Sequence, residues 1–129
     1  MILADTDVLI DYLRGHGPAA DRIALELEHG LATTVVSAFE LWAGSLGSGR
    51  RERAVQSLLG ALRIVPLDEE SSRMAAEVRH QLQARGRTLA MADALIAGIC
   101  IQSGAVLLTR NTRHFQDIPR LALGGLGPV

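Results

Sequence analysis

The sequence predicts an α/β fold: a three-layer α/β/α sandwich with a mostly parallel central sheet of four or five strands. Three observations lead to this prediction. The chain has 129 residues, of which 48% are hydrophobic, and this is enough to build one hydrophobic core. Short aliphatic or β-branched segments alternate with longer segments of helical periodicity. Such alternation is typical of parallel strands joined by helices that cover both faces of the sheet.

The expected strands are short, and each ends at a helix or a polar turn. They comprise residues 2–5, 31–36, 63–66 and 105–109. The second is rich in β-branched residues, the third stops at Pro66, and the fourth leads into the turn-like segment "RNTRHF" at 110–115. No linker or internal repeat interrupts this pattern. We therefore expect a single domain over residues 1–129, with "GGLGPV" at 124–129 as a mobile tail.

The expected helices follow from the spacing of apolar residues and from residues that begin or end helices. Pro18 suits the first turn of one helix, and Gly15 and Gly30 suit the ends of two helices. Ser37 and Glu40, three positions apart, form a capping-box signature at the start of another. The helices are expected at residues 7–15, 18–30, 37–47, 50–62, 68–86 and 88–104.

Composition narrows the classes of function. The formal net charge is only −1, all 13 basic residues are arginine, and aromatic residues make up 3% of the chain. A nucleic acid would therefore be held locally through its phosphates and not by stacking of bases on aromatic side chains. No segment reaches the roughly 18 uncharged apolar residues of a membrane span. The single Cys100 lies in an apolar run, which excludes a disulfide framework, so we expect a soluble, cytoplasmic protein.

Three acids occur where the predicted fold would gather them. Asp5 ends the first strand, and the carboxyl ends of strands form the ligand crevice of open parallel sheets. Glu40 lies one turn into the helix after the second strand, and right-handed crossovers would bring it to the same edge. Asp93 is the only charge between Arg87 and Arg110 and begins an apolar helix. Because an unpaired carboxylate there would be costly, we expect a positive group beside it.

A divalent metal ion would satisfy these carboxylates together. Mg²⁺ takes oxygen ligands and is commonly held by one or two carboxylates with water and substrate phosphates. Such an ion lowers the pKa of its bound water, which supplies a nucleophile for phosphodiester cleavage. Helix capping is the competing explanation for Asp5, Asp7 and Asp93, because a carboxylate at a helix start accepts free N–H groups. Only the joint arrangement of the acids favours the metal site.

Four segments together resemble a known family. The segments "ILADTDVLIDYLRG", "SAFELWAG", "MADALIAG" and "LLTRNTRHF" resemble, in this order, the four motif regions of PIN-domain ribonucleases. The likeness is greatest to the VapC-type toxins of bacterial toxin–antitoxin modules, and it covers essentially the whole chain. It implies a PIN-like fold, an endoribonuclease that depends on Mg²⁺ or Mn²⁺, a homodimer, and inhibition by a cognate antitoxin whose tail enters the active-site groove.

The resemblance also implies roles for single residues. It places the catalytic acids at Asp5, Glu40 and Asp93, with Asp5 and Asp93 as metal ligands. The fourth motif departs from the common acidic pattern, because Asn111 stands where many relatives carry aspartate. An amide offers a neutral oxygen but no charge, so a single metal ion is the preferred picture.

The segment after the last expected strand supplies the remaining candidate residues. Thr109, Arg110 and Arg113 should face the crevice and contact the substrate phosphate through hydroxyl and guanidinium groups. Asp7 or Asp117 could compensate for the missing fourth acid.

Three further expectations concern packing. We expect His114 to be a partly buried turn residue beside Phe115. Trp42 and Leu46, four apart on one helix, are expected to be core or dimer contacts. The apolar faces around Trp42 and Leu59 are the expected dimer contact.

Two other functions stay open. The D-x-D pattern at the end of the first strand also resembles the haloacid-dehalogenase phosphatases, in which Asp5 would be a covalent nucleophile and Asp7 its acid–base partner. Those enzymes normally use a lysine, and this chain has none. The second alternative is a catalytically impaired PIN scaffold that binds RNA or an antitoxin without cutting, and Asn111 is its best support.

Overall fold

A single five-stranded parallel sheet forms the centre of the computed structural model, which describes residues 1–126. Its strands are β1 (Ile2–Ala4), β2 (Ala32–Thr34), β3 (Arg63–Val65), β4 (Val106–Leu108) and β5 (Ala122–Gly124). They lie in the order β3-β2-β1-β4-β5, and every neighbouring pair is parallel. The expected α/β fold with a largely parallel sheet is therefore confirmed.

The helices agree with the expected ranges to within a few residues at most ends. They are α1 (Thr6–Arg14), α2 (Gly17–His29), α3 (Val35–Ser45), α4 (Gly49–Gly60), α5 (Glu69–Ala84), α6 (Met91–Ser103) and α7 (Thr112–Phe115). The short α7 lies in the segment expected to be only a turn. In the described part of the chain, no helix has the length and apolar character needed to cross a membrane.

The C-terminal segment differs in part from the expectation. Gly124 is the last residue of β5, so the predicted tail at 124–129 begins inside the sheet. The main-chain oxygen of Gly125 then accepts a hydrogen bond of 2.7 Å from the Arg22 guanidinium on α2. Residues 127–129 of the predicted tail lie outside the described residues.

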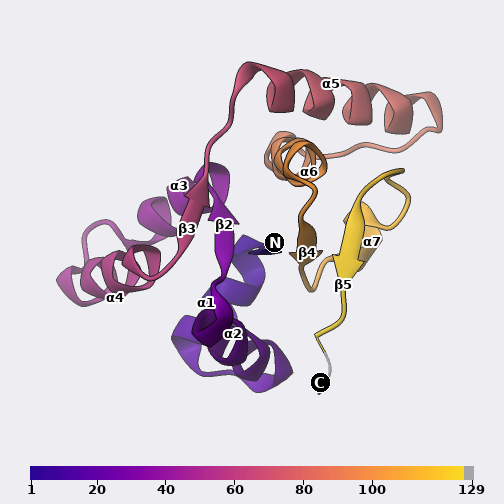
Figure 1. The fold of residues 1–129 in the computed structure, drawn as a ribbon. Coiled ribbons are helices and arrows are strands. Elements are labelled where there is room, and N and C mark those ends of the chain that lie inside the picture. Colours follow the sequence, from indigo (N-terminus) through magenta and orange to yellow (C-terminus); the bar gives the residue numbers. More distant parts are fainter. Residues whose placement is uncertain (127–129) are drawn as a thin grey trace.

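Helices cover both faces of the sheet because side chains alternate along each strand. Leu3 and Leu107 belong to the hydrophobic cluster that α5 and α6 complete, whereas Ala4 and Leu108 belong to the cluster with α1, α2, α3 and α4. Figure 1 shows α5 lying across α6 at the top of the view, away from α1 and α2 at the bottom. The result is the three-layer arrangement that the sequence predicts.

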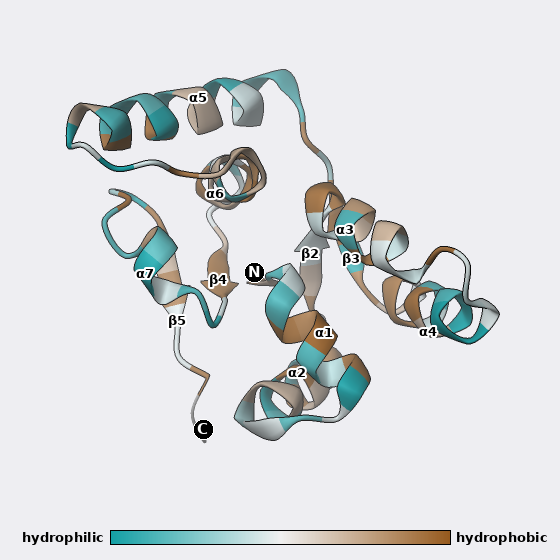
Figure 2. Ribbon diagram, turned by 180° about the vertical axis from the view of Figure 1, so that it is seen from behind, coloured by the Kyte–Doolittle hydropathy of each residue, from teal (hydrophilic) through white to brown (hydrophobic). Residues whose placement is uncertain are grey.

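The helix that carries Asp93 is the most deeply buried. Cys100 on α6 is a free thiol with no exposed surface, as expected. Gly98 allows α5 and α6 to approach closely, because a Cβ atom there would lie 2.8 Å from the backbone nitrogen of Ala75. Figure 2 shows teal and brown bands alternating along α5, the pattern of a helix that packs on one side and faces solvent on the other.

Candidate functional site

Asp5 lies between the carboxyl ends of β1 and β4, where the sequence places it. Its main-chain nitrogen donates to the Leu108 carbonyl at 2.9 Å, so the backbone is still paired with β4. Its side chain accepts hydrogen bonds from the Thr6 nitrogen and the Thr109 hydroxyl, each at 2.8 Å. Asp5 is only 4% exposed. The carboxylate is therefore held in one orientation by two strands and the first turn of α1.

The electrostatics of Asp5 connect it to two other acids. Its pKa rises from the ordinary 3.8 to about 6, chiefly because the carboxylate is buried. The negative charges of Asp7 and Asp93 act in the same direction, while the hydrogen bonds from Thr109 and Thr6 act against it. Three acids from two distant segments thus lie within electrostatic reach of one another. Such crowding is relieved by a positive charge.

Asp7 is half-buried and has one oxygen without a partner. Its Oδ2 atom accepts from the backbone nitrogen of Arg110 at 3.0 Å and lies 3.4 Å from the Thr109 hydroxyl. Its Oδ1 atom is buried and has no hydrogen-bond partner. Burial raises the pKa of Asp7, and the hydrogen bond from the Arg110 backbone opposes that shift.

Glu40 reaches the same edge of the sheet through Thr6. The Thr6 hydroxyl donates to Glu40 Oε1 at 2.7 Å and lies 2.9 Å from the Ser37 hydroxyl. The predicted capping box of Ser37 and Glu40 is wrong, because α3 begins two residues earlier and its N-cap is Thr34. The Thr34 hydroxyl accepts from the Ser37 nitrogen at 3.0 Å. Capping therefore does not account for the Glu40 carboxylate, which is bonded to the segment that contains Asp5.

Asp93 lies in the first turn of α6, and the expected positive partner is His114. Asp93 Oδ2 is 3.2 Å from His114 Nδ1, an ion pair when the imidazole is protonated. The side chain of His114 is 55% exposed, so the expectation of a partly buried residue is wrong. The neighbouring Phe115 fills that place in the core. This contact connects α6 to the segment that follows β4.

The residues that follow β4 differ in their burial and in their partners. Thr109 is buried, and its hydroxyl is directed at Asp5, so it positions the carboxylate. The exposed Arg110 pairs with Asp11, with Nε 2.6 Å from Oδ2. Asn111 is exposed, and its backbone nitrogen donates to the Thr109 hydroxyl at 3.0 Å.

Two residues of this segment turn toward Arg87. Asp117 forms an ion pair with Arg87 at the surface. The exposed Arg113 receives a hydrogen bond on its carbonyl oxygen from the Arg87 guanidinium at 2.8 Å. Asp117 therefore already has an arginine partner.

Sequence reasoning missed Thr6 and Asp11 as parts of this site. Thr6 connects Asp5 to Glu40, and Asp11 holds Arg110. The only signal for Thr6 was its place between two acids at the end of a strand. No local pattern predicts the contact between Asp11 and Arg110, because the two residues are far apart along the chain.

The acids fit a metal site of one or two carboxylates. In residues 1–126, no three or more His, Cys, Asp and Glu side chains are arranged to hold one ion together. The buried, unpartnered Oδ1 of Asp7 and the crowding of negative charge around Asp5 nevertheless suit a hard cation. Mg²⁺ commonly uses one or two carboxylates and completes its shell with water and phosphate oxygens.

A groove opens beside Glu40 between α1, α3 and α4. Its volume is about 610 Å³. Ile10, Leu41 and Val55 are among its apolar lining residues, and Arg14, Arg50 and Arg51 are its basic ones. The groove therefore combines apolar and cationic surface next to a candidate catalytic acid.

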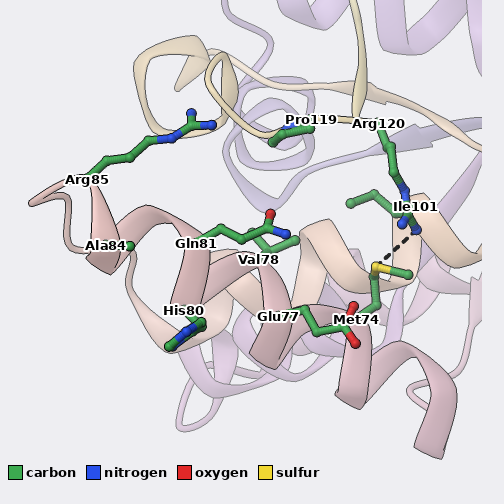
Figure 3. Close-up of a pocket in the computed structure, with 10 residues that line it drawn as sticks. All are labelled: Met74, Glu77, Val78, His80, Gln81, Ala84, Arg85, Ile101, Pro119 and Arg120. Carbon is green, nitrogen blue, oxygen red and sulfur yellow. Dashed lines mark hydrogen bonds between the residues drawn. The ribbon is translucent and has the colours of Figure 1, made fainter.

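A second cavity, of about 410 Å³, lies between α5, α6 and the segment before β5. Figure 3 shows the Arg120 guanidinium directed at the Met74 sulfur, with Arg85 apart from that pair at the left of the view. The nitrogen–sulfur distance is 3.1 Å. Glu77 is the only acid among the lining residues, so this cavity shares none of the acids around Asp5.

Comparisons with known proteins identify a family and a shared fold. The family model for the PIN domain matches residues 2–121. The ribonuclease VapC10 of Mycobacterium tuberculosis is 36% identical over 122 residues, which cover 94% of this chain and 90% of that protein.

Two solved structures share the fold. VapBC2 from Rickettsia felis, bound to a DNA fragment from its promoter, matches with a TM-score of 0.85 and 23% identity, covering 96% of this chain and 98% of that one. A toxin–antitoxin complex from Klebsiella pneumoniae matches with a TM-score of 0.78 and 22% identity, covering 100% of both chains.

Proposed function

Because the chain belongs to the PIN-domain family, we propose that it is a metal-dependent endoribonuclease that acts as the toxin of a bacterial toxin–antitoxin pair in the cytoplasm. The observation that carries this proposal is the buried Asp5, whose pKa is raised to about 6 beside Asp7 and Asp93. The haloacid-dehalogenase phosphatase alternative is not proposed, because the chain belongs to a different family.

The residues around Asp5 would have different roles in RNA hydrolysis. Asp5 and Asp93 would hold Mg²⁺ or Mn²⁺, and the bound ion would polarise a phosphoryl oxygen and lower the pKa of a water molecule. Thr6 holds Glu40 through Oε1, which leaves Oε2 to accept a proton from the attacking water. The Thr109 hydroxyl holds Asp5 by donating a hydrogen bond to Oδ2.

Exposed arginines near these acids would bind the RNA backbone. Arg110 is held by Asp11 through Nε, which would leave its terminal nitrogens to donate to a phosphate. Arg113 is exposed on α7 beside the same edge of the sheet. This division assigns positioning to Thr109 and phosphate binding to the two arginines.

RNA cleavage by the purified chain tests the proposal. We expect cleavage in MgCl₂ that is lost in EDTA and in the Asp93→Asn variant, and reduced about 100-fold or more in Glu40→Gln. Asp117→Asn is the matched control, because Asp117 pairs with Arg87 away from the acids. Cleavage that survives both EDTA and Asp93→Asn would contradict metal dependence. Failure to cut any RNA would favour the impaired scaffold.

An antitoxin would bind in the groove beside Glu40. The apolar lining and the arginines Arg14, Arg50 and Arg51 suit an amphipathic segment with acidic side chains. The toxin–antitoxin complex among the solved structures supports a cognate antitoxin as the partner. Arg50→Glu together with Arg51→Glu should weaken binding of the antitoxin encoded beside this gene, as measured by calorimetry.

A homodimer would form through the exposed face of α3 and not through Leu59. Leu59 is 7% exposed and belongs to the core beneath α4, so the expected contact at this residue is wrong. Four large apolar side chains on α3 and at its C-cap are instead exposed at spacings of four, three and four residues, which places them on one face. They are Val35, Phe39, Trp42 and Leu46.

Solution mass tests this contact. Phe39 is 70% exposed, so Phe39→Asp should leave the fold intact and convert the dimer to a monomer in multi-angle light scattering. Leu25→Asp on α2 is the control, because Leu25 is also exposed but lies off this face. A Phe39→Asp protein with unchanged mass would contradict an α3 interface.

A further inference from the structure

We propose that the hydroxyl groups of Thr6 and Ser37 position the Glu40 carboxylate so that it can take a proton from the attacking water. This inference rests on the proposed endoribonuclease function and adds two positioning residues to its site. The Thr6 hydroxyl lies 2.7 Å from Glu40 Oε1 and 2.9 Å from the Ser37 hydroxyl oxygen. Thr6 therefore connects a buried serine to the candidate catalytic carboxylate.

The Glu40 side chain depends on Thr6 for its orientation. Glutamate is among the side chains that lose the most rotamer freedom when they are fixed in place. Within residues 1–126, the only hydrogen bond to the Glu40 side chain comes from the Thr6 hydroxyl. A general base must lie within hydrogen-bond reach of the proton that it takes. Loss of the Thr6 hydroxyl would therefore leave Glu40 free to turn away from that position.

The hydroxyl groups form a row that is directed toward Glu40. Each hydroxyl has a single proton, and Thr6 gives its proton to the carboxylate because a bond to a charged acceptor is the stronger one. The Ser37 hydroxyl is then free to donate to the Thr6 oxygen. The Thr34 hydroxyl in turn donates to Ser37 Oγ at 3.3 Å. Successive bonds of this kind polarise one another, so each strengthens the next.

The inner end of the row is fixed by buried backbone contacts. Thr34 and Ser37 have no exposed surface. Thr34 is the N-cap of α3, and its hydroxyl accepts from the Ser37 nitrogen at 3.0 Å. Ser37 and Glu40 lie three positions apart on α3, which places them on the same side of the helix. The serine of the motif "SAFELWAG" therefore supports Glu40 through Thr6 instead of capping the helix.

RNA cleavage by two Thr6 variants tests the role of the hydroxyl. Valine keeps the branched shape of threonine and removes the donor, whereas serine keeps the donor. In MgCl₂, Thr6→Val should lower kcat about tenfold or more and leave KM for RNA unchanged, because only the placement of the base is lost. Thr6→Ser should recover most of the rate. Thr6→Val cleaving as fast as the unmodified chain would overturn the role of Thr6.

A double-variant cycle tests whether Ser37 acts through Thr6. Ser37→Ala alone should lower kcat, and it should lower it no further in a chain that already carries Thr6→Val. Ser45→Ala is the matched control, because Ser45 is also a buried serine of α3 but its hydroxyl donates to the Trp42 carbonyl at 2.9 Å. It should cleave as fast as the unmodified chain. Losses from Thr6→Val and Ser37→Ala that multiply would overturn the connection between the two residues.

Metal affinity gives a readout that a loosened site would change. The Thr6 backbone nitrogen, which donates to Asp5, is unaltered in Thr6→Val. The Kd of this variant for Mn²⁺, followed by the electron paramagnetic resonance of the free ion, should therefore equal that of the unmodified chain. A Kd that rises as kcat falls would show that Asp5 is disturbed, and this result would overturn the assignment to Glu40.

The outcomes also separate this inference from the function on which it rests. If the unmodified chain cleaves RNA and neither Thr6→Val nor Ser37→Ala slows it, the hydroxyl row has no part in positioning and the endoribonuclease function stands. If the unmodified chain cleaves no RNA in MgCl₂ or MnCl₂, both are overturned.

Discussion

Replacing Asp5 by asparagine should stabilise the chain in the absence of metal. The pKa of Asp5 is about 6 in the folded state and 3.8 ordinarily, mainly because of burial. The folded state therefore binds the proton more tightly than the unfolded chain does. Stability falls as the pH rises through the window from 3.8 to about 6, and the loss is complete above it. The difference between the folded and the unfolded pKa of Asp5 lowers the unfolding free energy by about 3 kcal/mol at pH 7.5.

Asparagine keeps the shape of the side chain and removes its charge. The oxygen can still accept from the Thr6 nitrogen, and the Thr109 hydroxyl can rotate to accept from the amide. Asp5→Asn should therefore gain up to about 3 kcal/mol at pH 7.5 in EDTA. At pH 4.5 the gain should shrink to about 1 kcal/mol, because the folded carboxyl is then already protonated.

Urea unfolding at the two pH values measures this difference. Asp117→Asn is the control, since its surface ion pair with Arg87 contributes about 1 kcal/mol or less at either pH. A gain that is absent at pH 7.5, or that is equal at both pH values, would refute the link between burial, repulsion and the stability of this site. Adding MgCl₂ should stabilise the unmodified chain and not Asp5→Asn.

Three other predictions concern the packing that supports the site. Gly98→Ala should lower the unfolding free energy by about 1–3 kcal/mol, because the new methyl group would meet the Ser71 carbonyl. Thermal denaturation that shows no loss of stability would contradict the tight contact between α5 and α6. Thr34→Ala should cost about 1 kcal/mol in urea unfolding by removing the hydroxyl that accepts from the Ser37 nitrogen, and it should leave the other helices unchanged. Burial raises the pKa of the Cys100 thiol to about 12, so a thiol reagent at pH 8 should label it only after unfolding, and rapid labelling of the native chain would disprove its burial.

The sequence alone was enough for the architecture and for the place of the first acid. Apolar spacing and helix-ending glycines predicted six of the seven helices and four of the five strands, because these signals are local. Asp5 was placed correctly since a polar residue that ends a buried strand must lie at the edge of the sheet. The strand β5 escaped prediction because "ALG" is too short and too weakly patterned to be distinguished from a tail.

Only the tertiary structure decided which groups meet at the site. Thr6 bonds to Glu40 across 34 positions, Thr109 bonds to Asp5 across 104, and His114 reaches Asp93 from a segment that gave no such signal. These contacts depend on how β1, β2 and β4 align side by side, and no local pattern encodes that alignment. Burial also depends on the whole fold, which is why the raised pKa of Asp5 could not be read from its neighbours in the chain.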